Sequence, residues 1–325
     1  MDDAARRPLT LRPPRYIAWE IAFWIFALAM WFVAPKYSAF FNEIAILALF
    51  AVSLDLILGY GGIVSLGHAA FFGTGAYAAA LFAKHVYPDP LVGLVVATAL
   101  ATLLGAATSF LVLRGSDLTR LMVTLGVALI LYELANRFDN ITGGADGLQG
   151  VVTGPLFGRF AFDLTGRVAY LYSLAVLFIL FMIARAIVNA PFGYSLKAIR
   201  DNPRRAAAIG IPVNARLTAV YTLAAAYAGA AGALLAQTTN FASLDVLEFH
   251  RSADVLLALV VGGTGWLYGG VIGTVAFKLL HDLFSTWTPQ YWQFWIGLVL
   301  VVLMLIGRDR IARTLRRLAE RRRAA

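Results

Sequence analysis

Long apolar runs recur along the whole chain, and they limit the available folds more than any other feature of the sequence. Each run is bounded by charged residues, proline or glycine. Most have about the 20 residues that a helix needs to cross the hydrocarbon core of a bilayer. We therefore predict an all-α bundle of membrane-spanning helices. The predicted spans are 17–34, 43–59, 63–83, 91–113, 121–136, 168–188, 216–238, 253–264, 267–283 and 290–307.

The overall composition agrees with a membrane protein. Of the 325 residues, 60% are hydrophobic and 14% are charged, whereas soluble domains average about 45–50% and about 25%. The first apolar run is too long for the core of a secretory signal and has no clear cleavage site, so we expect it to remain as the first span. The absence of cysteine excludes disulfides, thiolate metal sites and cysteine nucleophiles.

Lysine and arginine predict the orientation of the spans. Ten spans with a cytoplasmic N-terminus place about 20 of the 27 Lys and Arg residues on the cytoplasmic side, as the positive-inside rule requires. The cytoplasmic segments are an arm at 1–16, a turn at 114–120, a loop at 189–216 and a tail at 308–325. The longest external segment is 137–167. Both termini are therefore expected in the cytoplasm.

The number of spans stays open between eight and ten at this point. The region 253–283 is interrupted by glycine and could form a hairpin that enters the membrane without crossing it. Ten spans can form two halves of five spans that start from opposite sides of the membrane, as in an inverted repeat. The domain organisation is then one transmembrane permease domain, 17–307, between the arm and the tail. The arginine-rich tail favours contact with anionic lipid over nucleic acid.

A glycine-rich stretch, 59–77, lies between the second and third predicted spans. Each glycine costs a helix roughly 1 kcal/mol relative to alanine, and broken backbone at membrane depth is tolerated only where protein or a watery cavity covers it. We predict a discontinuous helix, either beside the substrate pathway or at a close helix contact. Asp55 could cap the broken helix, and for His68 we favour a structural hydrogen bond to a freed carbonyl. The candidate pathway residues are Gly59, Gly61, Gly62, Ser65, Gly67 and His68.

The loop at 189–216 is too long for a tight connection. Residues 195–200 and 204–209 each predict a short helix, with Pro203 in the first turn of the second and Gly210 after its end. Two interpretations remain open: a basic helix that lies on anionic lipid, and a docking element for a cytoplasmic partner. The apolar anchors are Leu196, Ile199, Ala206 and Ile209, and the basic side chains are Lys197, Arg200, Arg204 and Arg205.

A third stretch, 252–273, contains Gly262, Gly263 and Gly265 in the sequence Gly-Gly-Thr-Gly. No lysine follows, and the chain has no Gly-x-x-x-x-Gly-Lys-Ser/Thr motif, so it carries no nucleotide motor. We predict a tight turn between two short spans, with these glycines near the substrate pathway. The histidines lack metalloprotease spacing and no Gly-x-Ser-x-Gly elbow occurs. The sequence therefore predicts a transport protein, not an enzyme, with no metal and no cofactor of its own.

Taken in order, these stretches resemble the permease family of branched-chain amino acid ABC transporters, specifically the LivM type. The resemblance covers roughly residues 40–305. Two departures are Pro203, where the family usually has Glu, and Gly269-Gly270, where Gly-Pro is frequent. The matching pieces are the glycine-rich stretch 58–77, Thr-Gly-Gly-Ala-Asp-Gly-Leu at 142–148, Phe-Gly-Tyr-Ser-Leu-Lys-Ala-Ile-Arg-Asp-Asn-Pro-Arg-Arg-Ala-Ala at 192–207, and Ser-Ala-Asp-Val-Leu to Gly-Gly at 252–270.

The resemblance implies a permease subunit of an ATP-driven importer in the bacterial inner membrane. Its implied partners are a sister permease (identical or related), two cytoplasmic ATP-binding subunits that hold the ATP, and a periplasmic solute-binding protein. The implied substrate is a branched-chain amino acid, with urea, short amides and aromatic acids as alternatives. A rival hypothesis is an ion-coupled secondary transporter or channel that acts alone. The resemblance also implies which residues couple this chain to the ATPase: Leu196, Lys197, Ile199, Arg200, Arg204 and Arg205.

Overall fold

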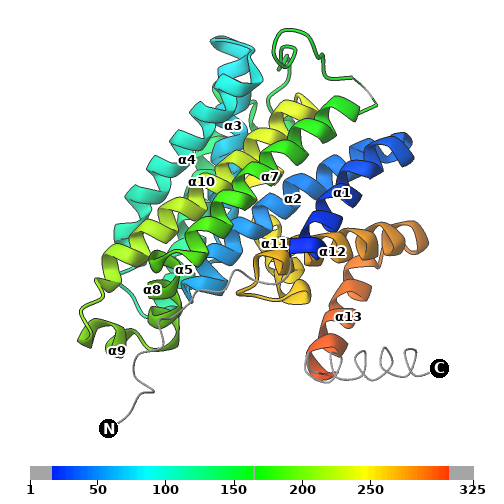
Figure 1. Cartoon of the computed structure of the whole chain (residues 1–325). Coiled ribbons are helices and arrows are strands. Elements are labelled where there is room, and N and C mark those ends of the chain that lie inside the picture. The colour runs from blue at the N-terminus through cyan, green and yellow to red at the C-terminus, as the bar shows by residue number, and fades with distance from the viewer. Residues whose placement is uncertain (1–16, 164, 307–325) are drawn as a thin grey trace, which may run out of the picture.

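The computed structural model describes residues 17–163 and 165–306, and these form a bundle of helices (Figure 1). The predicted arm at 1–16 and tail at 308–325 lie outside the described residues. Within the described residues, the sheet-like contacts are two isolated bridges, Leu148 with Ala242 and Leu156 with Phe160. The helices are α1 (Ile17–Val33), α2 (Ser38–Asp55), α3 (Ala69–His85), α4 (Pro90–Val112), α5 (Asp117–Arg137), α6 (Asp139–Thr142), α7 (Arg167–Asn189), α8 (Pro191–Asp201), α9 (Pro203–Ala208), α10 (Val213–Thr239), α11 (Phe249–Gly262), α12 (Leu267–Trp287) and α13 (Trp292–Ile306).

Six helical segments are long and apolar enough to cross a membrane, which confirms a helical membrane bundle. They are Pro35–Tyr60, Pro90–Val112, Asp117–Arg137, Arg167–Asn189, Val213–Thr239 and Leu267–Trp287. The shorter helices α1, α3, α11 and α13 coincide with the remaining predicted spans. Local chemistry sets several helix starts: the Asp89 side chain accepts hydrogen bonds from the Leu91 and Val92 backbone, and Pro90 occupies the first turn of α4.

Helices α2 and α10 form the centre of the bundle. The most apolar window of each is 72% buried, and α10 packs chiefly against α3, α4 and α2. Small residues allow these backbones to approach closely. A Cβ added at Gly75 in α3 would stand 2.1 Å from the carbonyl oxygen of Gly229 in α10. This is the small-residue packing that membrane helices use where no hydrophobic driving force acts between them.

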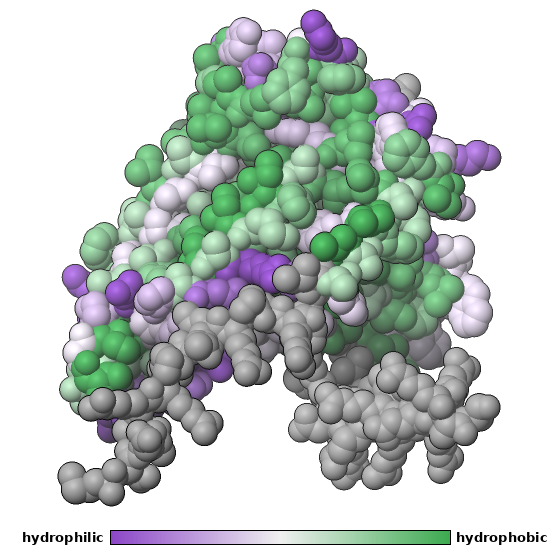
Figure 2. Space-filling view, in the orientation of Figure 1, coloured by the Kyte–Doolittle hydropathy of each residue, from purple (hydrophilic) through white to green (hydrophobic). Residues whose placement is uncertain are grey.

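Helices α4 and α5 cover the outside of the bundle with apolar side chains. Their most apolar windows are only 22% and 17% buried, so large residues such as Leu103, Phe110 and Met122 face outward. Apolar residues also dominate much of the face in Figure 2. A soluble protein rarely exposes apolar patches of this extent, so this outer face is suited to lipid or to another membrane chain.

The two ends of the bundle carry different connections. Helices α8 and α9 lie together at one end, while the α3–α4 connection and the 143–163 segment lie at the opposite end (Figure 1). Several predicted boundaries differ from the structure by a few residues: α2, α5 and α11 each begin about four residues earlier than predicted, and α12 ends four residues later. The third span begins at Ala69 instead of 63, the first loop helix begins at Pro191 instead of 195, and the second ends at Ala208. Proline at the first position of both loop helices explains their starts.

Candidate functional site

The glycine-rich stretch interrupts the helix that begins with α2. Residues Leu56–Tyr60 continue α2 as a single π-helical turn, and no helix follows until α3 begins at Ala69. Gly62 has a φ of +69°, a conformation that L side chains rarely adopt. The predicted discontinuous helix is therefore confirmed, and π-helical turns of this kind are frequent at functional sites.

Asp55 connects this break to the turn between α11 and α12. Its Oδ1 accepts a hydrogen bond from the Gly265 backbone N–H at 2.7 Å. Gly59 is packed between the two partners, because an added Cβ would stand 2.1 Å from Asp55 Oδ1 and 2.3 Å from the Gly265 nitrogen. The predicted cap by Asp55 thus acts on a turn far along the sequence and not on its own helix.

Arg200 of α8 reaches the same place from the loop. Its Nη1 donates a hydrogen bond to the Gly59 carbonyl oxygen at 2.5 Å. A Cβ at Gly62 would stand 2.9 Å from Arg200 Cγ, and one at Gly265 would stand 3.1 Å from Arg200 Nη1. Three stretches that the sequence singled out separately therefore meet at one point. We call Asp55, Gly59, Gly62, Arg200 and Gly265 the junction.

Helix α8 is attached to the bundle by its apolar face. Leu196 and Ile199 are buried, so they anchor the helix within this chain and do not face outward. The Lys197 ammonium lies 5.4 Å from the centre of the Tyr60 ring, at cation–π range. Arg204 and Arg205 are exposed. Ile209 is 74% exposed, so its prediction as an apolar anchor is wrong: α9 ends before it, and Ile211 packs on the bundle in its place.

His68 is fully buried and has a structural hydrogen bond. Its Nε2 lies 2.8 Å from the hydroxyl of Ser53, and its ring stacks on Phe50. The partner is thus a hydroxyl and not the freed carbonyl that we expected. Ser65 is buried as well. Both side chains are closed to solvent in this conformation.

Two further pathway candidates mark close backbone contacts. A Cβ at Gly67 would stand 1.8 Å from the carbonyl oxygen of Thr124 in α5, and one at Gly61 would stand 2.7 Å from the Ile57 carbonyl oxygen. Both glycines are thus required by packing as the chain leaves α2. The structure brings Gly59 and Gly62 to Arg200, while Gly67 lies against α5.

Helices α11 and α12 form a tight hairpin around the second glycine cluster. Gly263 and Gly265 have φ values of +102° and +76°. A Cβ at Gly262 would stand 1.8 Å from the Gly269 carbonyl oxygen and 2.7 Å from the Gly273 Cα. The predicted tight turn is therefore confirmed, but only α11, with 14 residues, is a short helix, because α12 has 21 residues.

A second polar region, which the sequence analysis missed, lies between α2, α11, α12 and α13. It is a cavity of ≈ 410 Å³ whose lining includes Glu43, Arg251, Asp254 and Lys278. The Lys278 ammonium is 2.5 Å from a carboxylate oxygen of Glu43. A signal for it was present in the sequence, since Asp254 and Lys278 are charged residues inside predicted spans, where such residues are functional candidates.

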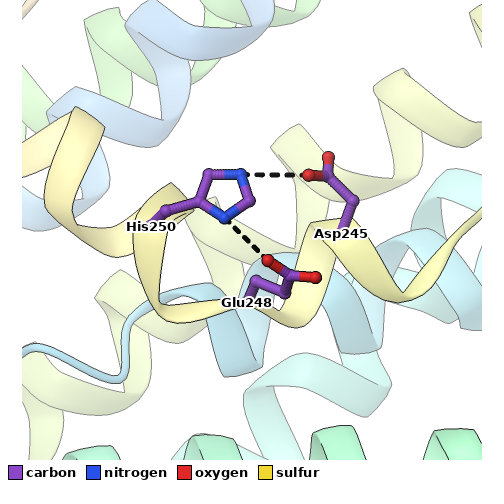
Figure 3. A group of neighbouring side chains, drawn as sticks. All are labelled: Asp245, Glu248 and His250. Atoms are coloured by element: carbon purple, nitrogen blue, oxygen red, sulfur yellow. Dashed lines mark hydrogen bonds and ion pairs between the residues drawn. The ribbon is translucent and has the colours of Figure 1, made fainter. Parts of the chain in front are cut away.

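Beside this cavity, Asp245, Glu248 and His250 gather as in a metal site (Figure 3). Their ligand atoms lie within 4.8 Å of one another. Both imidazole nitrogens of His250 already face carboxylates, Nε2 at 3.0 Å from Asp245 and Nδ1 at 2.9 Å from Glu248. Arg251 pairs with the other oxygen of Asp245. An imidazole that binds a metal needs a free nitrogen lone pair, so we interpret this group as an ion-pair network.

The fold and the junction define a multi-pass membrane protein: an apolar bundle, a broken central helix and a partly basic loop that packs against the break. The chain belongs to the family described as "Branched-chain amino acid transport system / permease component", which matches residues 37–306. Family membership confirms the resemblance found in the sequence. It also makes the chain a transport component and not an enzyme.

The relatives of this chain are named for the transport of two kinds of solute, branched-chain amino acids and galactosides. The LivM permease protein of the high-affinity branched-chain amino acid system of Salmonella typhimurium is 30% identical over 78% of this chain and 64% of its own length. Its Escherichia coli counterpart is 29% identical over the same shares. The galactose/methyl galactoside import permease MglC of Salmonella typhimurium is 25% identical over 84% of this chain and 88% of its own length. This chain thus spans 64% of the LivM relatives. No solved structure matches it.

Proposed function

We propose that this chain is the transmembrane permease subunit of an ATP-driven importer of branched-chain amino acids in the bacterial inner membrane. The observation that carries the proposal is the junction, where Arg200 of the loop contacts Gly59 at the helix break and Gly265 in the α11–α12 turn. A push on α8 would reach the centre of the bundle through these contacts. The family and the LivM relatives support the same assignment.

The proposed motor is a pair of separate ATP-binding subunits that dock on α8 and α9. Arg204, Arg205 and Ile209 are exposed on this segment, so they form the face that such a partner would contact. Other side chains of α8 pack against the rest of the bundle and would transmit the movement. They are Leu196, Lys197, Ile199 and Arg200. A sister permease would cover the apolar outer face, a periplasmic binding protein would deliver the solute, and lipid would surround the rest.

We propose ten crossings with both termini in the cytoplasm. Helices α1, α2, α3, α4 and α5 then form the first half, and α7, α10, α11, α12 and α13 form the second. The second crossing of each half, α2 or α10, is a central helix with a 72% buried apolar window. After each of them the regular α-helix stops, with a π-helical turn at Leu56–Tyr60 and a 3-10 turn at Leu244–Leu247 in the two connections. This correspondence supports an inverted repeat. The solute pathway would run beside the breaks that contain Gly59, Gly61, Gly62, Ser65, Gly67, His68, Gly262, Gly263 and Gly265.

Galactoside import is the second candidate function, because the MglC relative is matched over a larger share of its own length than LivM. The test is reconstitution of the full-length chain with its copurifying subunits in proteoliposomes. We expect uptake of L-leucine that requires ATP and the binding protein. Uptake of galactose and not leucine would assign the sugar function. Leucine uptake by the chain alone under an ion gradient, without ATP, would support a secondary transporter and overturn the proposal.

A further inference from the structure

We propose that the cavity between α2, α11, α12 and α13 binds the α-amino acid itself, with Asp254 receiving its ammonium group and Arg251 and Lys278 receiving its carboxylate. The inference rests on the proposed amino-acid import and adds to it a solute site within this chain. The cavity volume of ≈ 410 Å³ lies within the range of about 300–1,000 Å³ that small-molecule sites occupy.

With the proposed ten crossings, the cavity lies toward the external side, where a solute would enter. Its lining comes from the first two turns of α11, the first turn of α13, the second half of α12 and the first ten residues of α2. The α11–α12 turn, at the other end of the hairpin, belongs to the junction with Arg200. The cavity and the junction thus lie at opposite ends of the same hairpin. Movement of the hairpin would therefore change both.

Asp254 is the acceptor for the ammonium group. It is half-buried on α11 and lines the cavity, yet among the described residues it forms no hydrogen bond or ion pair. The other charged residues of the cavity each have a partner: Lys278 pairs with Glu43, and Arg251 pairs with Asp245. The basic groups of His250, Arg251 and His281 act on Asp254 electrostatically without a direct pair. Because a partly buried carboxylate is costly unless it is paired and hydrogen-bonded, a cationic group of the solute would supply the direct pair.

Arg251 and Lys278 provide the positive side of the cavity. Arg251 uses Nε and Nη2 to bind Asp245, so Nη1 takes no part in that pair. Lys278 carries three N–H donors, and one of them serves Glu43. Donors therefore remain for a carboxylate of the solute. Opposite charges on α11 and α12 are the arrangement that a zwitterion requires.

An aromatic and apolar wall completes the cavity. The His281 ring packs edge-on against Trp292, with 4.5 Å between ring centres, and Phe277 and Leu47 line the same space. These side chains give an apolar amino-acid side chain a surface to bury. The network of Asp245, Glu248 and His250 holds the start of α11 beside the cavity (Figure 3). It thereby fixes the position of Arg251.

The test measures direct binding to the purified transport complex in nanodiscs, without the binding protein. L-Leucine, leucinamide (no carboxylate), 4-methylpentanoate (no ammonium) and D-galactose are titrated while tryptophan fluorescence is recorded, because Trp292 lines the cavity. We expect leucine to bind and each one-charge analogue to bind at least about tenfold more weakly, since each analogue loses one of the two charge interactions with the site. Trp292→Phe should remove the signal.

Variants separate this site from a purely structural role. Asp254→Asn should weaken leucine binding about tenfold or more and leave 4-methylpentanoate binding unchanged, a selectivity that a folding defect would not produce. Asp282→Asn, which removes an exposed carboxylate from α12, should bind leucine as the wild type does. If the complex imports leucine but Asp254→Asn binds it with wild-type affinity, the site is wrong and the function stands. If the complex imports only galactose, the function and the site both fail.

Discussion

The carboxylate of Asp55 accepts a hydrogen bond from the backbone N–H of Gly265, at 2.7 Å and across 210 positions of sequence. This contact joins the end of α2, in the first half of the chain, to the α11–α12 turn in the second. Arg200 contacts residues on both sides of it. The α8 loop therefore has a direct physical route to both broken regions of the bundle.

The first prediction concerns the acceptor at position 55. Asp55→Leu removes it and leaves the Gly265 N–H unsatisfied, which should lower stability by about 1–3 kcal/mol. Asp55→Asn keeps a side-chain oxygen and should lose less. Thermal unfolding in detergent, followed by intrinsic tryptophan fluorescence, measures both variants. Asp282→Leu serves as the matched control on an exposed carboxylate, and equal melting temperatures for Asp55→Leu and the control would contradict the prediction.

The second prediction separates docking from transmission. Arg204→Glu together with Arg205→Glu changes exposed residues of α9, so copurification of the ATP-binding subunits should fall. Arg200→Ala removes a charged donor from the Gly59 carbonyl and should leave copurification intact while transport per ATP hydrolysed falls. The measurements are subunit stoichiometry after affinity purification and the ratio of leucine uptake to phosphate release.

Arg159→Glu, an exposed residue of the external segment, is the control for the charge reversal and should change neither quantity. If Arg200→Ala instead loses the ATP-binding subunits, then Arg200 acts mainly at the docking surface. Coupling through Gly59 would then be rejected.

The sequence predicted the helices well because the bilayer itself fixes their length. A run of apolar residues needs no knowledge of its neighbours to be assigned as a helix, and breaks such as Gly62 and Gly263 follow from local backbone preference. Contacts across the chain were not predictable in this way. Nothing near Asp55 in the sequence indicates that its partner is Gly265, and the cavity was missed because Glu43, Asp254 and Lys278 come from three different helices.

The third prediction concerns the close crossing of α3 and α10. Gly75→Leu places a side chain where even a Cβ would stand 2.1 Å from the Gly229 carbonyl oxygen, so α3 and α10 cannot keep their separation. We expect loss of the monodisperse peak when a fluorescent fusion is examined by size-exclusion chromatography. Gly126→Leu in α5 is the matched control, because nothing lies within 4 Å of its added Cβ. A monodisperse Gly75→Leu protein would show that the crossing is looser than described.

The last prediction concerns the proposed orientation. The chain has no cysteine, so a single introduced thiol reports on its own position without background. Arg204→Cys in α9 and Arg159→Cys in the external segment both replace exposed residues. An impermeant maleimide should label Arg159→Cys in intact spheroplasts and Arg204→Cys only in inside-out vesicles, because the basic loop is expected on the cytoplasmic side. Labelling of Arg204→Cys in spheroplasts would invert the topology and remove α8 and α9 from the reach of a cytoplasmic ATPase.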